Sequence, residues 1–212
     1  GQVRSLKTTE SVNQDLLDLY VRDPRPLYRL YEQKEVCLVM GAGRKAEEDV
    51  FLEQVASDAV PVFRRRGGGG TVVLSPGQLV LAVVTEVASP FQNLQYFQSF
   101  NNWFRLALQP LGVSGIEDRG ISDLAVGEKK ILGTSLYRRR KILFYQASLL
   151  VDNDLSLFER YLRFPSRVPQ YRRGRGHLEF CTNLRRQGYP LSVSQVKESL
   201  DQVVKDRLFL LA

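Results

Sequence analysis

The stretch VFRRRGGGGTVVL, residues 62–74, places four consecutive glycines between two short apolar segments. Glycine has no Cβ, so such a loop lets a ligand approach the backbone closely and can turn N–H groups toward an anion. The adjacent guanidinium groups of Arg65 and Arg66 suit bidentate recognition of phosphate or carboxylate. No Gly-Lys-Ser/Thr follows the glycines, so the stretch is not a P-loop. We interpret residues 67–70 as an anion-binding loop, with a flexible turn beside a solvated basic flank as the alternative.

Hydrophobic periodicity around this loop predicts strands and helices that do not strictly alternate. Turn signals at 75–77 and 127–128 predict two hairpins. The predicted fold class is α+β (α/β), with a mixed, largely antiparallel sheet flanked by helices in a single domain. We expect helices over 11–20, 46–56, 92–108 and 155–162 and after the Ser192 and Ser194 caps, and strands over 27–31, 35–40, 60–63, 71–74, 79–84, 123–126, 130–133 and 142–151.

Composition excludes several kinds of site. The 212 residues include one His and two Cys, too few for a zinc site built from these residues alone or for a disulfide framework. A Ser-His-Asp triad would need His177, whose Arg-rich surroundings are typical of a surface loop. Every apolar run is too short to cross a bilayer, and residues 2–10 are too polar for a signal peptide, so we expect a cytoplasmic protein.

The chain is basic, with 30 Lys and Arg against 23 Asp and Glu and a formal net charge of +7. Much of the excess lies in clusters at 64–66, 138–141 and 172–175. Such a surface favours an anionic partner, either a nucleotide, a nucleic acid or an acidic protein domain. Solvated surface loops are the alternative for each cluster.

Two further motifs carry candidate chemistry. Gly41-Ala-Gly43-Arg-Lys-Ala46 stands between a predicted strand and a predicted helix and is similar to a dinucleotide fingerprint, although hairpins follow it where a regular βαβ alternation is expected. Lys130 begins an apolar strand that continues into Gly133-Thr-Ser135. An ammonium group there could stabilise negative charge developing on a carbonyl or phosphoryl oxygen. A surface hairpin lysine is the alternative.

Taken in order, these motifs resemble the lipoate-protein ligase family, which is related to biotin protein ligases and octanoyltransferases. The resemblance extends from about Asn13 to Leu184. It rests on LVMG at 38–41, the arginine and glycine core at 65–72, PG at 76–77, SDL at 122–124 ahead of KKILG at 129–133, DLSLFERYL at 154–162, PSR at 165–167, YRRGR at 171–175 and TNL at 182–184.

The resemblance implies a fold like that of biotin synthetase and class II tRNA synthetases. It implies a ligase that uses ATP and magnesium to activate lipoate or octanoate as an acyl-adenylate and then transfers the acyl group to a lysine of a lipoyl domain. The expected partners are an acidic lipoyl-domain acceptor and a separate accessory-domain protein, with no nucleic acid and no membrane. After Leu184 one helix remains, so we expect a single catalytic domain over residues 1–212 without a C-terminal accessory domain.

The resemblance also assigns the site by position. Lys130 is the expected catalytic residue, and no metal ligands are assigned. The expected substrate- and nucleotide-binding residues are Arg65, Arg66, Gly67, Gly68, Gly69, Gly70, Thr71, Asp123, Gly133 and Thr134.

Several positions depart from the family pattern. Leu74, Tyr137 and Gln146 stand where polar contacts to the nucleotide or acyl group are usual. The cysteine that serves acyl-transfer relatives of this family as nucleophile has no counterpart just ahead of Lys130. We therefore expect Cys181, about fifty residues downstream, to be structural and a covalent acyl-cysteine to be absent. The alternatives are a degenerate homologue that binds an acyl group or carrier domain without turnover and, from charge alone, a nucleic-acid-binding module.

Overall fold

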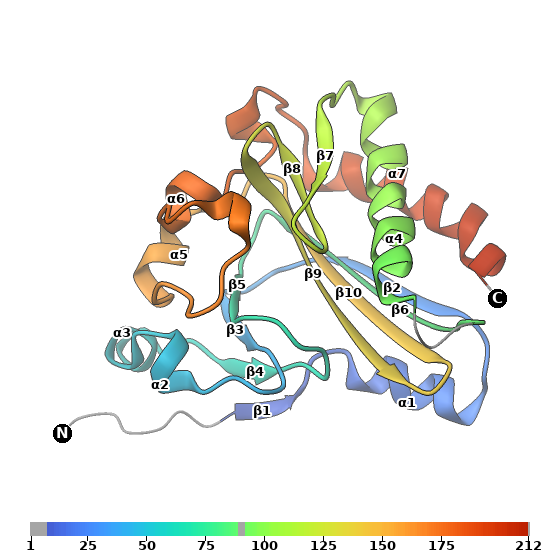
Figure 1. Ribbon diagram of the computed structural model, residues 1–212, viewed down its shortest axis with the longest axis horizontal. Helices are drawn as coiled ribbons and strands as arrows, with labels where there is room; N and C mark the ends of the chain where they lie inside the picture. The colour runs from blue at the N-terminus through green and yellow to red at the C-terminus, as the bar shows by residue number, and fades with distance from the viewer. Residues whose placement is uncertain (1–7, 89–91, 212) are drawn as a thin grey trace.

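The computed structural model describes residues 8–88 and 92–211, so most of the polar segment 2–10 lies outside it. A six-stranded antiparallel sheet forms the centre of the molecule, in the order β2-β6-β10-β9-β8-β7 (Figure 1). The paired strands β6 and β10 are buried along nearly their whole length, as expected for a sheet covered on both sides. The strands are β2 (Leu27–Glu32), β6 (Gln78–Glu86), β7 (Ile116–Arg119), β8 (Asp123–Val126), β9 (Lys129–Arg139) and β10 (Ile142–Leu150).

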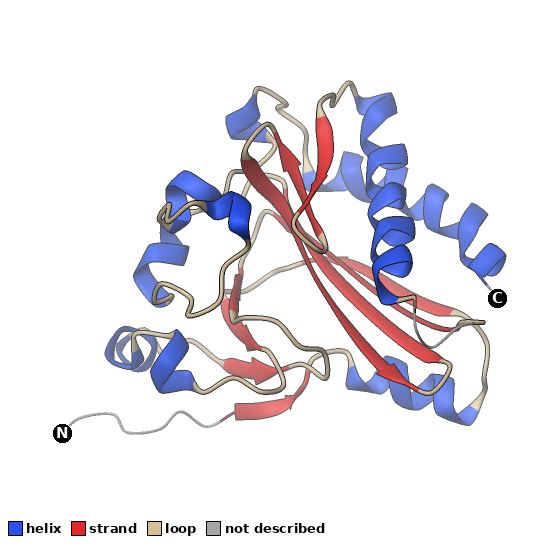
Figure 2. Cartoon of the chain, viewed as in Figure 1, coloured by secondary structure: helices blue, strands red, loops and turns tan. Residues whose placement is uncertain are grey.

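A second, four-stranded sheet has the order β1-β4-β3-β5 and mixes parallel and antiparallel pairs. Its strands are β1 (Thr8–Ser11), β3 (Cys37–Met40), β4 (Val62–Arg64) and β5 (Val72–Leu74). The glycine loop joins the inner strand β4 to the edge strand β5 and therefore lies at the end of β3, which stands between them. Both sheets lie between helices (Figure 2), and the predicted α+β class is confirmed.

The helices cover opposite faces of the large sheet. The long helices α4 (Asn93–Leu108) and α7 (Val193–Arg207) bury one face in a core that includes Phe100, Phe104 and Leu200. Ser192 caps α7 by accepting a hydrogen bond from the amide of Gln195, as the sequence predicted for this start. On the other face lie α1 (Gln14–Arg22), α2 (Ala46–Asp49), α3 (Leu52–Ser57), α5 (Ser156–Tyr161) and α6 (His177–Phe180), together with the small sheet (Figure 1).

The first predicted hairpin is wrong. The strands on either side of residues 75–77 belong to different sheets, because the chain crosses from β5 to β6 there and β5 pairs with β3. Gly77 adopts φ +87° at the crossing, and a Cβ on it would overlap the backbone of Asn153. The second hairpin, β8–β9, is confirmed, and β9 continues six residues beyond the predicted strand.

Other boundaries differ for local reasons. The predicted helix 46–56 divides into α2 and α3, because Val50 forms an isolated bridge with Leu162 and Phe51 donates to the carbonyl of Tyr161. The first predicted helix starts at Gln14, since Ser11 is still in β1. The expectation that no βαβ unit follows Gly41 is also wrong: β3, α2, α3 and β4 form one, with β3 and β4 parallel. Strands β1 and β7 and helix α6 were not predicted.

Candidate functional site

Arg65 organises the glycine loop from inside the protein. Its side chain is 7% exposed. Its Nε and Nη2 donate to the carbonyl of Gly68 at 3.2 and 2.7 Å, Nη2 also donates to that of Gly70 at 2.7 Å, and Nη1 donates to that of Val39 at 3.2 Å. Burial lowers the pKa of this guanidinium to about 10, so it stays charged near neutral pH. Arg65 thus fixes the loop through its carbonyl groups and makes no use of its amide groups.

The segment 41–44 supports the same loop from outside. A Cβ on Gly41 would overlap the carbonyl group of Gly69, so the two backbones meet at a distance that only glycine permits. The amide of Ala42 donates to the carbonyl of Gly67 at 3.0 Å. Arg64 Nη1 donates to the carbonyls of Gly41, Ala42 and Arg44 at 3.0 to 3.1 Å. The motif that is similar to a dinucleotide fingerprint therefore packs against the glycine loop.

Strand β9 brings Lys130 to the face on which the glycine loop lies. A Cβ on Gly67 would lie 3.0 Å from Ser135 Oγ, so the loop rests on this strand. A Cβ on Gly133 would lie 3.4 Å from Lys130 Cε and 3.5 Å from Nζ, so the lysine side chain extends over Gly133. The residues predicted at 67–70 and at Lys130 are thus brought together along one strand.

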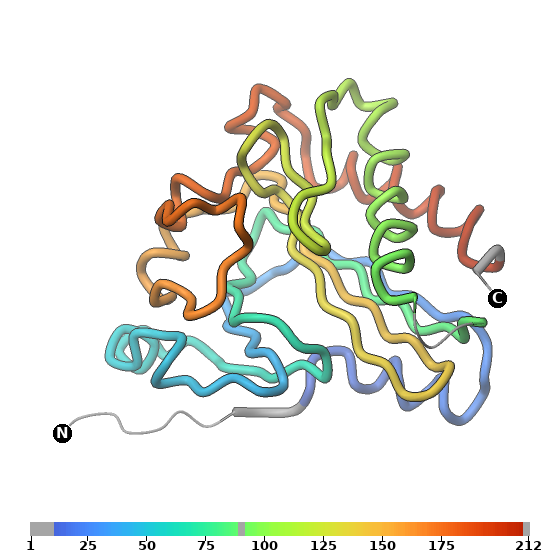
Figure 3. Tube along the Cα trace, viewed as in Figure 1, coloured from blue at the N-terminus to red at the C-terminus, as the bar shows by residue number. Residues whose placement is uncertain are grey.

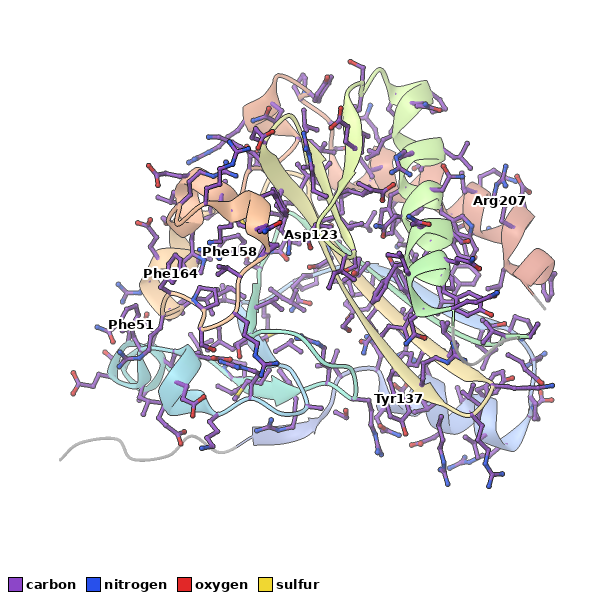
Figure 4. All side chains as sticks on the ribbon, in the orientation of Figure 1. Phe51, Asp123, Tyr137, Phe158, Phe164 and Arg207 are labelled. Atoms are coloured by element: carbon purple, nitrogen blue, oxygen red, sulfur yellow. The ribbon has the colours of Figure 1, made fainter. Side chains whose placement is uncertain are left out.

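Asp123 holds the lysine in place. Its Oδ1 lies 2.7 Å from Lys130 Nζ, and the two side chains are 13% and 25% exposed. Its Oδ2 accepts a hydrogen bond from the hydroxyl of Tyr171 at 2.8 Å. Burial, followed by the charge of Asp123, raises the pKa of Tyr171 far above that of a free phenol, so the hydroxyl stays a donor. Figure 4 shows Asp123 on β8, toward the segment that carries Phe164.

The remaining predicted residues occupy different places. Thr134 Oγ1 donates to the carbonyl of Ser122 at 3.0 Å, one residue before Asp123. Thr71 donates to Asp49 at 2.5 Å, and Arg44 pairs with the same carboxylate. Burial opposes ionisation of Asp49, but these two hydrogen bonds outweigh it and lower the pKa. Arg66 is exposed and donates to Gln14 Oε1 at 2.8 Å, so its guanidinium points away from the buried loop contacts.

The three departures from the family pattern are accommodated in the fold. Leu74 is buried between the sheets with Val39 and Val80. Tyr137 packs against the α1 cluster near the far end of β9 (Figure 4). Gln146 lies beside Ser135 in the sheet, and its Oε1 accepts a hydrogen bond from Asn13 Nδ2 at 3.0 Å. Gln146 therefore keeps a polar group on the face that carries the site.

Cys181 lies beside Lys130, although 51 residues separate them in the sequence. Residues 130 and 181 form an isolated parallel bridge, and the amide of Thr182 donates to the carbonyl of Lys130 at 2.9 Å. Burial raises the pKa of the Cys181 thiol, although Lys130 and Arg172 act in the opposite direction. At neutral pH this cysteine is therefore a thiol, which is a weak nucleophile.

His177 was predicted in a surface loop, but it is half-buried and begins α6. Its Nε2 lies 3.1 Å from the carbonyl of Arg163, which can only accept, so Nε2 carries the proton. Burial lowers the pKa of the imidazole. Two partners of predicted site residues were not predicted: Tyr171, which contacts Asp123, and Asp49, which contacts Thr71. The YRRGR motif at 171–175, which includes Tyr171, could have pointed to that residue. No motif in the sequence points to Asp49.

Two further findings concern membrane spans and metal-binding clusters. Across residues 8–88 and 92–211, none of the helices combines the length and the apolar character needed to span a membrane. Within the same residues, no group of three His, Cys, Asp or Glu side chains could hold a metal ion by itself.

In this α+β fold an ordered glycine loop and a strand lysine share one face, an arrangement that could stabilise negative charge on an oxygen. The family can be stated as well. The family model of the lipoyl protein ligase A/B catalytic domain matches residues 9–205, and the chain belongs to this family.

Curated relatives include both ligases and transferases. The chain is 28% identical over 137 residues to lipoate–protein ligase 1 of Staphylococcus aureus, covering 64% of this chain and 40% of the relative. It is 27% identical over 150 residues to lipoate-protein ligase A subunit 1 of Thermoplasma acidophilum, covering 66% and 56%. An octanoyltransferase of Prochlorococcus marinus is 29% identical over 134 residues, covering 63% and 59%. The chain thus matches less than two thirds of the length of each relative.

Solved structures share the fold. A bi-partite lipoate protein ligase described with its E2 lipoyl domain, from Thermoplasma acidophilum, superposes with a TM-score of 0.78 at 22% identity, covering 95% of this chain and 82% of that one. A lipoate-protein ligase A bound with ATP superposes with a TM-score of 0.76 at 24% identity, covering 97% and 84%.

Proposed function

We propose that this protein is an ATP-dependent lipoate- or octanoate-protein ligase. The observation that carries the proposal is the ammonium group of Lys130, held by Asp123 on the same face of β9 as the glycine loop that Arg65 organises. A cation on the same face as a glycine-rich backbone loop suits chemistry in which negative charge develops on oxygen. Membership of the lipoyl protein ligase family supports lipoate or octanoate as the acyl group.

The first step would form an acyl-adenylate. A carboxylate oxygen of the acyl substrate attacks the α-phosphorus of ATP, the bond from that phosphorus to the bridging oxygen breaks, and pyrophosphate leaves with the electron pair. Charge accumulates on the phosphoryl oxygens as the new bond forms. Lys130 and the amides of the glycine loop are the groups that stabilise it, in a site that Asp123 and Arg65 have already ordered.

The second step would transfer the acyl group. The uncharged ε-amine of an acceptor lysine attacks the carbonyl carbon of the adenylate, and a tetrahedral oxyanion forms. The bond from that carbon to the phosphate oxygen then breaks, AMP leaves, and the amine gives its proton to solvent, leaving an amide. The same lysine and amides stabilise this oxyanion.

Asp123 is the site carboxylate through which magnesium would be held. Mg²⁺ is usually bound by one or two carboxylates together with substrate phosphates, so a single protein carboxylate fits an ion carried by ATP. An ionised carboxylate offers more than one lone pair on each oxygen, so Asp123 could bind an ion and still accept the hydrogen bond from Tyr171. When bound, the ion would neutralise phosphate charge. The protein contributes the Asp123 carboxylate, which Lys130 and Tyr171 hold in position.

The acceptor would be an acidic lipoyl domain. The net charge of +7 favours its approach, and exposed Arg66 lies beside the glycine loop. The solved bi-partite ligase supports a second chain as the accessory component. We accordingly take residues 1–212 as one catalytic domain that works with such a partner.

An adenylation assay with a lysine pair tests this proposal. Pyrophosphate release from ATP and lipoate, or octanoate, is measured for the wild type, Lys130→Ala and the matched control Lys129→Ala, whose side chain is exposed. We expect Lys130→Ala to lower the rate by about a hundredfold or more without loss of fold, because it removes a charged group acting in the transition state. Lys129→Ala should keep nearly the full rate. Wild-type activity in Lys130→Ala would show that the lysine has been misassigned.

One observation favours a second candidate, an acyltransferase. Cys181 lies beside Lys130, and relatives with the name octanoyltransferase exist. In that case the Cys181 thiolate would take the acyl group from a thioester donor, releasing the donor thiol, and would pass it on to the acceptor amine. The raised pKa of the thiol opposes this route. A degenerate homologue would bind the acyl group and form neither the adenylate nor the acyl-cysteine.

A further inference from the structure

A basic segment between α5 and α6 covers one side of the site. We call residues 163–176 the strap. The strap runs past the β8–β9 hairpin (Figure 3), where Arg175 Nη1 donates to the carbonyl of Glu128 at 2.9 Å. At the β7–β8 turn it comes so close that a Cβ on Gly120 would lie 3.4 Å from the Tyr171 ring.

The strap is held in one conformation by its own arginines. Arg172 is 4% exposed, and its guanidinium lies 4.7 and 4.8 Å from the ring centres of Phe164 and Phe180. Arg172 Nε donates to the carbonyl of Arg175 at 2.9 Å, while Arg175 returns bonds to the carbonyls of Arg172 at 3.0 Å and Tyr171 at 2.7 Å. The Tyr171 ring also packs on Phe180, with centres 5.0 Å apart. Tyr171 is therefore presented from a fixed backbone.

The fixed tyrosine completes a chain of three groups. One oxygen of Asp123 accepts from Tyr171 at 2.8 Å, and the other lies 2.7 Å from Lys130 Nζ. A carboxylate bound at both oxygens cannot rotate without breaking one of these interactions. The orientation of Asp123, and with it the place of the ammonium group over Gly133, thus depends on the strap.

We propose that Tyr171 is a positioning residue of this site: its hydroxyl fixes the Asp123 carboxylate and thereby the Lys130 ammonium group. The position of the strap then sets the availability of the lysine. The catalytic meaning of this arrangement rests on the proposed ligase function, whereas the physical coupling of Tyr171 to Lys130 does not.

The test compares Tyr171→Phe with a matched control, Tyr28→Phe. Tyr28 also donates to a carboxylate, Asp201 Oδ1, at 2.7 Å, but this pair joins β2 to α7 on the opposite face of the large sheet. Each full-length protein is labelled with trace acetic anhydride, and acetylation of Lys130 is measured by mass spectrometry against the exposed neighbour Lys129. We expect labelling of Lys130 to rise about three- to tenfold in Tyr171→Phe, as loss of one hydrogen bond to a charged group allows, and to stay unchanged in Tyr28→Phe.

Arg175→Gln provides a second variant that keeps the tyrosine. It removes the bonds from Arg175 to Glu128 and Tyr171, so it should raise Lys130 labelling in the same direction. Thermal melting checks that each variant is folded. Unchanged or decreased labelling of Lys130 in a folded Tyr171→Phe protein would overturn the proposal, and so would an equal rise in Tyr28→Phe.

Kinetics separate positioning from general loosening. In Tyr171→Phe we expect kcat for adenylate formation to fall about tenfold, while KM for ATP and for the acyl acid changes less than about twofold. A variant that only loosens the site would raise KM and leave kcat near the wild-type value, which would contradict the proposal. If the wild type forms no adenylate, the ligase function fails, and the labelling result still decides the role of Tyr171.

Discussion

Arg65 and Lys130 show how two basic residues of one site do different work. Arg65 is buried, and its guanidinium donates hydrogen bonds to the backbone carbonyls of Val39, Gly68 and Gly70. Its role is therefore to fix the conformation of the glycine loop. Lys130 is partly exposed, and its partner is a single carboxylate, from which a ligand could draw it. The sequence could predict that both belong to the site, because both lie in recognisable motifs. It could not predict which side chain is buried against backbone carbonyls and which stays partly exposed.

The variant Cys181→Ser tests whether this cysteine takes part in acyl transfer. We expect Cys181→Ser to keep acyl-transfer activity within about twofold of the wild type, because a thiol with a raised pKa is a weak nucleophile and serine nearly conserves its volume. The measurement is acylation of the acceptor domain by both proteins from the acyl acid and ATP. Isolation of an acyl-thioester at Cys181 during turnover would establish the transferase route instead.

The spatial neighbours of Lys130 mark the limit of sequence reasoning at this scale. Asp123 could be predicted, because it precedes the same hairpin. Cys181 pairs with Lys130 from 51 residues away, and Tyr171 reaches Asp123, the partner of the lysine, from 48 residues away. No local sequence pattern specifies either contact. Their contacts follow from the packing of the strap and α6 on β8 and β9.

At the scale of elements, the glycine loop depends on the neighbouring segment 41–44. We expect Gly41→Ala to lower the free energy of unfolding by about 1–3 kcal/mol and to slow adenylate formation, because its Cβ would push Gly69 away. Gly43→Ala is the matched control, since no atom lies within 4 Å of its Cβ position. Its effect on stability should stay within about 0.5 kcal/mol. Denaturant unfolding of both variants checks this, and equal effects would contradict the described packing.

The ion pair between Arg44 and Asp49 predicts that the stability of the protein depends on pH. The pKa of Asp49 is lowered in the folded state, so its contribution to stability is fully present above the unfolded pKa of about 3.8 and is lost as pH falls through the folded value. Asp49→Asn should therefore lower stability at pH 7 by about 1.5–3 kcal/mol, the range for hydrogen bonds to a charged group. The difference from the wild type should shrink below pH 4 in unfolding experiments. A difference that stays constant down to pH 3 would contradict this assignment.

Element prediction succeeded where one pattern settled the structure and failed where pairing was non-local. The helix predicted over 92–108 is α4, because its apolar residues recur at helical spacing and a proline follows. The turn at Gly77 was read correctly as a turn, but turn chemistry does not say whether the next strand returns to its neighbour. Here it enters a second sheet, and this crossing places the glycine loop of the small sheet against β9 of the large one.

At the scale of the whole molecule, two sheets meet at the site. The large sheet contributes Lys130 and Asp123, and the small sheet contributes the glycine loop between β4 and β5. The α+β class could be predicted from the clustering of strands, and the family from the order of the motifs. The existence of two separate sheets could not, because each strand's partner is chosen by packing across the core.

Acyl transfer to an acceptor domain is the decisive measurement for the proposed ligase function. A lipoyl domain is incubated with the protein, lipoate or octanoate, ATP and magnesium, and in parallel with pre-formed lipoyl-adenylate, and its intact mass is measured. We expect addition of one acyl group in both reactions, with Lys130→Ala inactive. Addition from the adenylate alone would place activation with a partner chain. An acceptor unmodified under both conditions would contradict the ligase function.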